Sequence, residues 1–308
     1  MSRLLFGCGY LGERVALKWR DSGHHVTIVT RSTAKSERLR TQGFQTLVAD
    51  ITQLETLGEL PKAEIILFSV GFDRSTQQTI QQVYTDGMHH VLSRLSVHGE
   101  DRLIYISTTG VYASTADSTA QETWVDEHWP THPLRAGAQA SLAAEQLLAD
   151  HPSRKRAVIL RMAGIYGPGR IPYQENLRAG LPLAVPQEGW LNLIHVDDAV
   201  AAILAAEAWP AKDTSHGPEI FNVVDGQPVV RGDYYREVAR LIGASPPRFT
   251  EPVIRLPATA RAATSKQICN RKLIKTLGVK LAYPSYREGL VDSLGYINKA
   301  ESRKRKAK

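Results

Sequence analysis

The chain opens with a short apolar run that is followed at once by three spaced glycines. Residues 3–6 are typical of a buried strand, and Gly7, Gly9 and Gly12 then form a G-x-G-x-x-G pattern at the head of a helical stretch over 10–22. In such a turn the first glycine permits a sharp bend, the second lets a phosphate approach the backbone, and the third allows close helix–strand packing. The free N–H groups of the helix start favour an anion. This feature predicts a parallel α/β sheet that binds a dinucleotide beside its first strand.

Strand-like and helix-like segments alternate along the first two thirds of the chain. This alternation indicates parallel strands joined by helical crossovers, in a Rossmann-like doubly wound α/β sheet. Such a sheet binds its ligand at the carboxyl ends of its strands. The runs predicted as strands are 3–6, 25–30, 46–49, 64–70, 102–107, 157–162 and 219–224. The stretches predicted as helices are 10–22, 76–97, 138–149, 197–208, 233–242, 270–277 and 285–297.

The alternating pattern weakens after residue 168, where Pro- and Gly-rich pieces and later helices add no obvious strand to the sheet. We therefore expect a dinucleotide-binding domain and a smaller, C-terminal, substrate-side lobe. The predicted domain covers 1–168 with 190–225 returning to it, the lobe covers 169–189 and 226–298, and 299–308 form a basic disordered tail.

The formal net charge of +7 is concentrated at the end of the chain. The last ten residues hold six basic side chains against one acid, which leaves about +2 for the rest. We expect a solvated tail and no nucleic-acid binding by the globular part. No apolar run reaches the roughly 18–20 residues that span a bilayer, and the first strand begins almost at Met1. Cys8 and Cys269 form neither a disulfide framework nor a metal spacing, so a cytoplasmic protein without metal or membrane attachment is expected.

The residues after the second and third predicted strands indicate the type of dinucleotide. Arg31 stands where an acid would accept from the ribose 2′-hydroxyl of NAD, and its guanidinium could bind a 2′-phosphate. A solvated surface arginine is the alternative. Asp50 could accept from the adenine amino group or cap the next turn. These residues favour NADP, with NAD also possible. The predicted cofactor-binding residues are Gly7, Gly9, Tyr10, Leu11, Gly12, Arg31, Ser32, Asp50, Ile51 and Ser69.

The glycine loop and four further segments resemble the extended short-chain dehydrogenase/reductase superfamily. The resemblance is strongest to its atypical, NAD-dependent epimerase/dehydratase-like members. The four segments are Ser-Thr-Thr-Gly-Val-Tyr at 107–112, Leu-Arg-Met-Ala-Gly-Ile-Tyr-Gly-Pro-Gly at 160–169, Leu-Ile-His-Val-Asp-Asp at 193–198 and Phe-Asn-Val at 221–223. The resemblance implies a Rossmann fold, an NAD(P) cofactor, a small-molecule substrate and, as often in this superfamily, a homodimer.

The superfamily's proton-transfer motif is missing from the chain. Members use a Ser or Thr after the fifth strand, a Tyr, and a Lys four residues beyond that Tyr. Thr108 falls at the hydroxyl position, but Gly137 stands where the Tyr belongs and Ser141 where the Lys belongs. No tyrosine in the chain is followed four residues later by a lysine. Because a positioned acid contributes about 10²–10⁴-fold to rate, any reaction here needs different acid/base residues.

Tyr112 and Tyr166 are candidate substitutes, because both follow predicted strands of the sheet. Packing in the core is the alternative for each of them. By resemblance, Arg170, Asn192 and Arg231 are expected to contact the substrate. The sequence thus predicts an NAD(P)-dependent oxidoreductase or epimerase-like enzyme for a small carbonyl or sugar-type substrate. The alternative is a non-catalytic dinucleotide sensor or regulatory protein.

Overall fold

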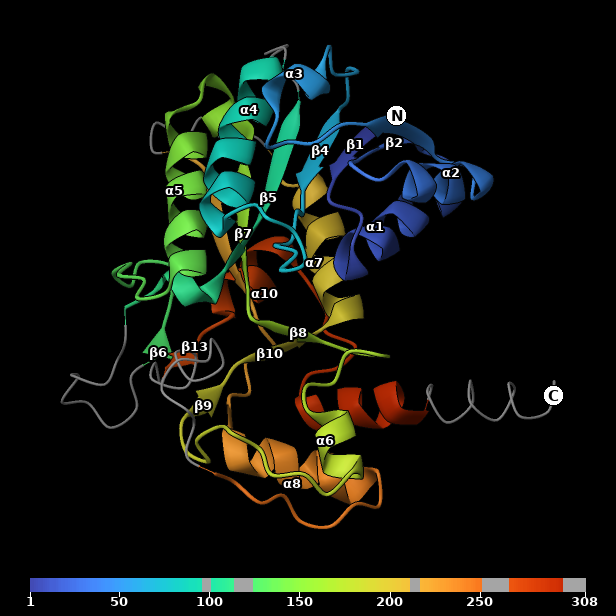
Figure 1. The fold of residues 1–308 in the computed structure, drawn as a ribbon. Helices are drawn as coiled ribbons and strands as arrows, with labels where there is room; N and C mark the ends of the chain where they lie inside the picture. The colour runs from blue at the N-terminus through green and yellow to red at the C-terminus, as the bar shows by residue number, and fades with distance from the viewer. Residues whose placement is uncertain (96–100, 114–123, 211–216, 251–265, 296–308) are drawn as a thin grey trace. The chain divides into compact units, whose positions relative to one another are not determined.

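The structure is a computed structural model and describes residues 1–95, 101–113, 124–210, 217–250 and 266–295 (Figure 1). The predicted basic tail lies outside these ranges. The chain forms two compact units, which are described separately. Unit 1 comprises Met1–Val111, Pro133–Arg161 and Val200–Phe221, and unit 2 comprises Tyr112–His132, Met162–Ala199 and Asn222–Lys308.

A seven-stranded sheet forms the centre of unit 1, in the order β11-β7-β5-β4-β1-β2-β3. The neighbouring strands from β3 across to β5 run parallel. Its strands are β1 (Ser2–Phe6), β2 (His25–Thr30), β3 (Gln45–Val48), β4 (Ile65–Phe68), β5 (Arg102–Thr108), β7 (Val158–Met162) and β11 (Glu219–Val223). All seven predicted strands belong to this sheet, with ends within two residues of the prediction. The doubly wound α/β fold is therefore confirmed.

The strand order places the topological switch point of the sheet at β1. This strand pairs with β2 on one side and with β4 on the other, and Phe6 lies opposite Phe68 of β4. The crossovers from β1 and β4 leave in opposite directions, and doubly wound sheets bind ligands at this point. Gly7 and Ser69, which follow the two paired phenylalanines, lie at the carboxyl ends that form it.

Helices cover both faces of the sheet, with α4 (Gly87–Arg94) and α5 (Ala136–Asp150) on one face and α1 (Tyr10–Asp21) on the other (Figure 1). Strand alternation sends Leu4 and Phe6 into the core shared with α4 and α5. On the opposite face, Trp19 Nε1 donates to Glu207 Oε1 of α7 (Val196–Glu207) at 2.5 Å. The remaining short elements of unit 1 are α2 (Thr33–Thr41), α3 (Leu54–Leu57), η1 (Gln82–Asp86), η2 (Thr109–Val111) and η3 (Pro152–Arg156).

The helix predicted over 76–97 begins later than expected. Helical structure starts at Ile80 and passes through η1 into α4. The Thr79 N–H donates to Gln82 Oε1 at 2.8 Å, and the Gln82 N–H donates back to Thr79 Oγ1 at 3.2 Å. This reciprocal pair is a capping box, which fixes the helix start. Residues 71–79 consequently form a loop at the carboxyl end of β4.

Unit 2 consists of short strand pairs and helices around a tyrosine-rich core. Its buried tyrosines include Tyr166, Tyr234, Tyr235 and Tyr286. The strand pairs are β8 (Gly164–Tyr166) with β10 (Leu193–His195), β9 (Trp190–Leu191) with β12 (Val229–Val230), and β6 (Trp124–Val125) with β13 (Gln267–Ile268). Its helices are α6 (Gln174–Arg178), α8 (Arg231–Leu241), α10 (Arg271–Leu277) and a helix over 286–295. In the part of the chain that the structure describes, no helix is long and apolar enough to cross a bilayer.

Candidate functional site

Two glycines of the loop after β1 are required by the packing of unit 1 itself. Gly7 has a φ of +90°, and a Cβ there would lie 2.5 Å from the backbone carbonyl group of Ser69. A Cβ at Gly12 would lie 2.2 Å from the Gly7 carbonyl oxygen. Backbone atoms cannot move aside as a flexible side chain can, so neither position accepts another residue without a shift of the loop. These contacts hold the start of α1 close against β1 and β4.

Gly9 differs from the other two glycines of the loop. It is exposed, it precedes the first residue of α1 with a φ of −91°, and a Cβ built there would have no atom within 4 Å. The fold of unit 1 therefore does not require glycine at this position. A glycine here leaves the backbone open to a group that approaches the helix start, where the first N–H groups point away from the helix.

Positive charge lies beside this loop. Lys35 of α2 donates from Nζ to the carbonyl oxygen of Cys8, and Arg14 lies 4.0 Å above the Tyr10 ring and donates to the Tyr10 carbonyl at 2.8 Å. Burial raises the pKa of the Cys8 thiol to about 11, against the opposing charge of Lys35. Cys8 is therefore a protonated, buried side chain at neutral pH. Lys35 is absent from the predicted site residues because α2 has too little amphipathic pattern to reveal a helix.

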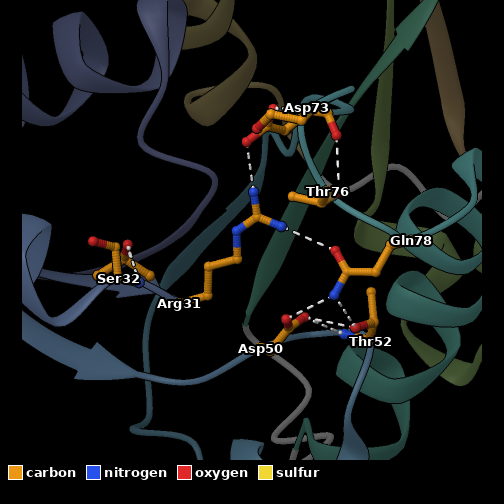
Figure 2. Close-up of polar contacts among 9 residues, drawn as sticks. Arg31, Ser32, Asp50, Thr52, Asp73, Thr76 and Gln78 are labelled. Atoms are coloured by element: carbon orange, nitrogen blue, oxygen red, sulfur yellow. Dashed lines mark hydrogen bonds and ion pairs between the residues drawn. The ribbon is translucent and has the colours of Figure 1, made fainter.

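Arg31 and Asp50 belong to one hydrogen-bonded network at the ends of β2, β3 and β4 (Figure 2). Arg31 donates from Nη2 to Asp73 Oδ2 at 2.7 Å and from Nη1 to Gln78 Oε1 at 2.9 Å. Gln78 Nε2 in turn donates to Asp50 Oδ2 and to Thr52 Oγ1, each at 2.9 Å. Gln78 thus links two residues that the sequence predicted separately for the adenosine half of the cofactor.

Both acids of this network are charged at neutral pH. Burial raises the pKa of Asp50, but hydrogen bonds from Thr52 and Gln78 and the charge of Arg31 outweigh it, so the net pKa is lowered. The hydroxyl and N–H of Ser75, followed by Arg31, lower the pKa of Asp73. Asp73 and Gln78 were not predicted as site residues. A signal for them exists, since a polar stretch directly follows the strand at 64–70, at the sheet edge that binds ligands.

Two other predicted cofactor residues, Ser32 and Ser69, use their hydroxyl oxygens within unit 1. Ser32 caps α2 by accepting from the Lys35 N–H at 3.2 Å, and Ser69 Oγ donates to the Gly7 carbonyl at 3.3 Å. Leu11 and Ile51 are buried in the core. Direct contacts of these residues with a cofactor stay a prediction.

Thr108 lies at the end of β5, partly exposed, and accepts from the Gly110 N–H at 3.0 Å. A Cβ at Gly110 would lie 3.2 Å from this Thr108 hydroxyl and 2.6 Å from Nη2 of Arg135, the residue before α5. The hydroxyl and the guanidinium therefore lie beside the same glycine. Arg135 was not predicted as a site residue, because it precedes rather than occupies the superfamily's motif positions.

The helix of the missing motif is present as α5, but its motif positions carry other contacts. Ser141 is buried and donates from Oγ to the Gly137 carbonyl at 2.9 Å, one turn earlier in the same helix. Further along α5, Glu145 accepts from the Ser107 hydroxyl and forms a 2.6 Å ion pair with Arg161, with both side chains about 5% exposed. These contacts fasten α5 to β5 and β7.

The two candidate tyrosines of unit 2 are buried, with hydroxyls that already donate. Tyr112 donates to Asn222 Oδ1 at 2.7 Å, and Tyr166 donates to the Ser285 carbonyl at 3.4 Å. Burial raises the pKa of Tyr166 further above its ordinary value. These positions favour the packing alternative, and the acid/base role of either tyrosine stays a prediction.

The predicted substrate residues also lie in unit 2. Asn192 donates to the Lys266 carbonyl and accepts from the Ile268 N–H, each at 2.8 Å. Arg231 is buried and donates to the Glu188 carbonyl at 2.7 Å, while Arg170 is exposed. Their contact with a substrate stays a prediction. Among the described residues, no three His, Cys, Asp or Glu side chains are grouped so that they could hold a metal ion.

Residues 4–223 match the NAD dependent epimerase/dehydratase family. The chain belongs to this family. It is 26% identical over 288 residues to Protein YeeZ of Escherichia coli K12, covering 91% of this chain and 95% of that protein. It is also 26% identical over 307 residues to 3-diazoavenalumate denitrifying reductase of a Streptomyces species, covering 92% and 96% of the two chains.

A solved structure extends the comparison to the fold. UDP-glucuronic acid 4-epimerase from Bacillus cereus, in complex with UDP-glucuronic acid and NAD, superposes with a TM-score of 0.75 at 19% identity. The match covers 97% of this chain and 100% of that chain. At this identity the likeness shows a shared fold. Together with the family match, it confirms the resemblance to extended short-chain dehydrogenases/reductases.

Proposed function

We propose that this protein is an NADP-preferring oxidoreductase that acts on a small carbonyl or sugar-type substrate with non-standard acid/base residues. The observation that carries the proposal is the contrast within the glycine loop. Gly7 and Gly12 are fixed by the packing of unit 1, whereas Gly9 is exposed and has open space where its Cβ would be. A glycine that the fold does not need fits a backbone approached by a pyrophosphate.

The surrounding residues fit the rest of a dinucleotide. The start of α1 and the charge of Lys35 would offset the pyrophosphate. Asp50 would accept from the adenine amino group, and Arg31 would bind a ribose 2′-phosphate through its guanidinium. The bound cofactor would supply or accept a hydride. The Bacillus cereus epimerase, which shares the fold, was solved with NAD.

On the reacting side, Thr108 would donate a hydrogen bond to the substrate oxygen. Arg135, beside the same glycine, would stabilise the negative charge that develops on this oxygen when the carbonyl is reduced. An arginine holds its proton too firmly to act as the acid, so the proton would come from water. The Streptomyces relative is a reductase by name, which supports reduction as the reaction class.

The first test is a fluorescence titration of the purified protein with NADPH and with NADH. We expect micromolar binding of NADPH, weaker binding of NADH, and at least about 100-fold weaker binding of both to Gly9→Val because a side chain blocks the pyrophosphate. Thermal unfolding should show that this variant is folded, since its side chain meets no protein atom at Cβ and only the preference for glycine at the N-cap of α1 is lost. Unchanged NADPH affinity in a folded Gly9→Val protein would contradict the cofactor site.

The second step follows oxidation of NADPH with panels of aldehydes, ketones and nucleotide sugars. Removing one hydrogen bond to a developing oxyanion costs about 10²–10³-fold in kcat, so Thr108→Val should lose this much. Arg135→Leu should lose a similar factor while Arg135→Lys retains part of the rate. NADPH affinity should not change in any of the three. Firm NADPH binding without turnover on any panel would favour the sensor alternative.

A further inference from the structure

Arg31, the residue proposed for the 2′-phosphate, is engaged by an acid of its own chain. Its Nη2 donates to Asp73 Oδ2 at 2.7 Å, and the two side chains remain 40% and 50% exposed. Asp73 belongs to the loop 71–79, which follows β4, whereas Arg31 follows β2. The contact therefore joins two strand ends on the ligand-binding edge of the sheet (Figure 2).

The loop holds this carboxylate in place independently of Arg31. Asp73 Oδ1 accepts from the Ser75 N–H at 3.0 Å and from the Ser75 hydroxyl at 2.7 Å. The Asp73 carbonyl accepts from the Thr76 hydroxyl at 2.9 Å. One carboxylate oxygen is thus fastened to the loop while the other faces the guanidinium. Asp73 is consequently a preorganised anion at the position proposed for a 2′-phosphate.

We propose that Asp73 is a specificity-determining residue that competes with the ribose 2′-phosphate of NADP for Arg31. In this way it limits the preference for NADP over NAD. The inference rests on the proposed function, because it needs the dinucleotide to lie at this edge of the sheet. It adds a residue that acts against Arg31, rather than with it, in the choice of cofactor.

The physical basis is that carboxylate and phosphate bind the same donors and repel each other. A 2′-phosphate must either displace Asp73 from Arg31 or lie beside its negative charge, and both options weaken binding. A 2′-hydroxyl carries no charge and can donate to a carboxylate, so NAD does not meet this obstacle. Because the Arg31–Asp73 pair is half-exposed and screened, we expect a modest factor of about two- to ten-fold.

Because Gln78 also holds the Arg31 side chain, the charge of Asp73 can be removed without releasing Arg31 from its position. Its side-chain oxygen accepts from Arg31 Nη1 at 2.9 Å, and its amide nitrogen is held by Asp50 and Thr52. Loss of the Asp73 charge therefore leaves Arg31 with an anchored neutral partner. Asp73→Asn should free the guanidinium charge without releasing the side chain.

The experiment measures calorimetric affinities for adenosine 2′,5′-bisphosphate and for AMP, which differ only in the 2′-phosphate. It uses the full chain as wild type, Asp73→Asn, Arg31→Ala and the double variant. Asp21→Asn is the matched control, since it removes one charge from the exposed Arg20–Asp21 pair, also at 2.7 Å, at the far end of α1. Thermal unfolding checks that each variant is folded.

We expect Asp73→Asn to tighten the bisphosphate about two- to ten-fold and to leave AMP within about two-fold. Asp21→Asn should alter neither affinity, and Asp73→Asn should gain clearly less in the Arg31→Ala background, where only the direct repulsion between carboxylate and phosphate remains. Equal tightening of both probes, the same gain in Asp21→Asn, or an undiminished gain in the Arg31→Ala background would each overturn the inference. In those cases the wild type still binds and the proposed function stands. Failure of the wild type to bind either probe would instead overturn the proposed cofactor site, and the inference with it.

Discussion

The glycine loop before α1 and the first turns of α5 are both helix starts in unit 1, but they are constrained in different ways. Gly7 and Gly12 would clash with backbone atoms if replaced, so packing alone maintains them. The motif positions 137 and 141 of α5, by contrast, carry Gly and Ser, and the Ser141 hydroxyl donates to the Gly137 carbonyl of the same helix. The turn that presents Gly9 is thus fixed by the packing of the sheet, whereas α5 forms with Gly137 and Ser141 in place of the superfamily's Tyr and Lys.

The largest expected effect concerns the buried Glu145–Arg161 ion pair, which fastens α5 to the sheet. Glu145→Gln should lower the free energy of unfolding by about 3–5 kcal/mol, because Arg161 is left as a buried, uncompensated charge. Urea unfolding measures this loss. The control is the double variant Glu145→Leu/Arg161→Met, which removes both charges and should recover most of the stability. A loss below about 1 kcal/mol in Glu145→Gln would show that α5 is held by other contacts and would weaken the comparison.

The next prediction compares Gly12, which is packed against backbone atoms, with Gly9, which is not. Gly12→Ala should cost about 1–3 kcal/mol of unfolding free energy through overpacking against the Gly7 carbonyl. Gly9→Ala should cost less, at most about 1 kcal/mol, because its side chain meets no protein atom and only the preference for glycine at the N-cap of α1 is lost. Denaturant unfolding of the two variants, without any ligand, measures the difference. Equal losses would mean that Gly9 too is kept for packing, and the contrast would fail.

The third comparison, which ends with the smallest expected effect, separates packing from catalysis in unit 2. Tyr112→Phe should cost about 1–3 kcal/mol, because Asn222 Oδ1 would lose its buried donor. Tyr166→Phe should cost less, since its hydroxyl makes a longer bond of 3.4 Å. Thermal unfolding compares the two variants. A Tyr112→Phe protein of full stability that has lost turnover would instead support the acid/base role predicted from the sequence.

The sequence predicted the sheet well because its strands are continuous buried runs, which have a strong local signal. Helix α2 was missed because only Ser36 and Leu39 of its nine residues are buried, which leaves no apolar stripe. The helix predicted over 76–97 wrongly included residues 76–79 of the loop 71–79, although the sequence carries the Thr79-x-x-Gln82 capping signal.

The site was predicted less completely than the fold. The glycine loop and Arg31 were predicted because each is recognised from nearby sequence: the loop by its glycine spacing, and Arg31 by its position directly after the second strand. The pairing of Arg31 with Asp73 joins residues 42 positions apart and depends on how one loop turns at a strand end. Topology places both residues at the same sheet edge. Which side chains pair there depends on the conformation of the loop, and loop conformation has no periodic signal in the sequence.

The central position of β1 in the sheet also governs how the chain can fold. Ser2 pairs with His25, but Arg3 on the same strand pairs with Ile65, and the edge strand β11 ends only at Val223. During synthesis, β1 therefore meets β2 early but must wait for its second partner, β4, which follows some sixty residues later, and β11 completes the sheet only after that. Pairings between such distant segments slow folding and leave strand edges exposed in the meantime. We therefore expect the strand order that creates the switch point to leave sheet edges of the nascent chain unpaired until β11 has joined.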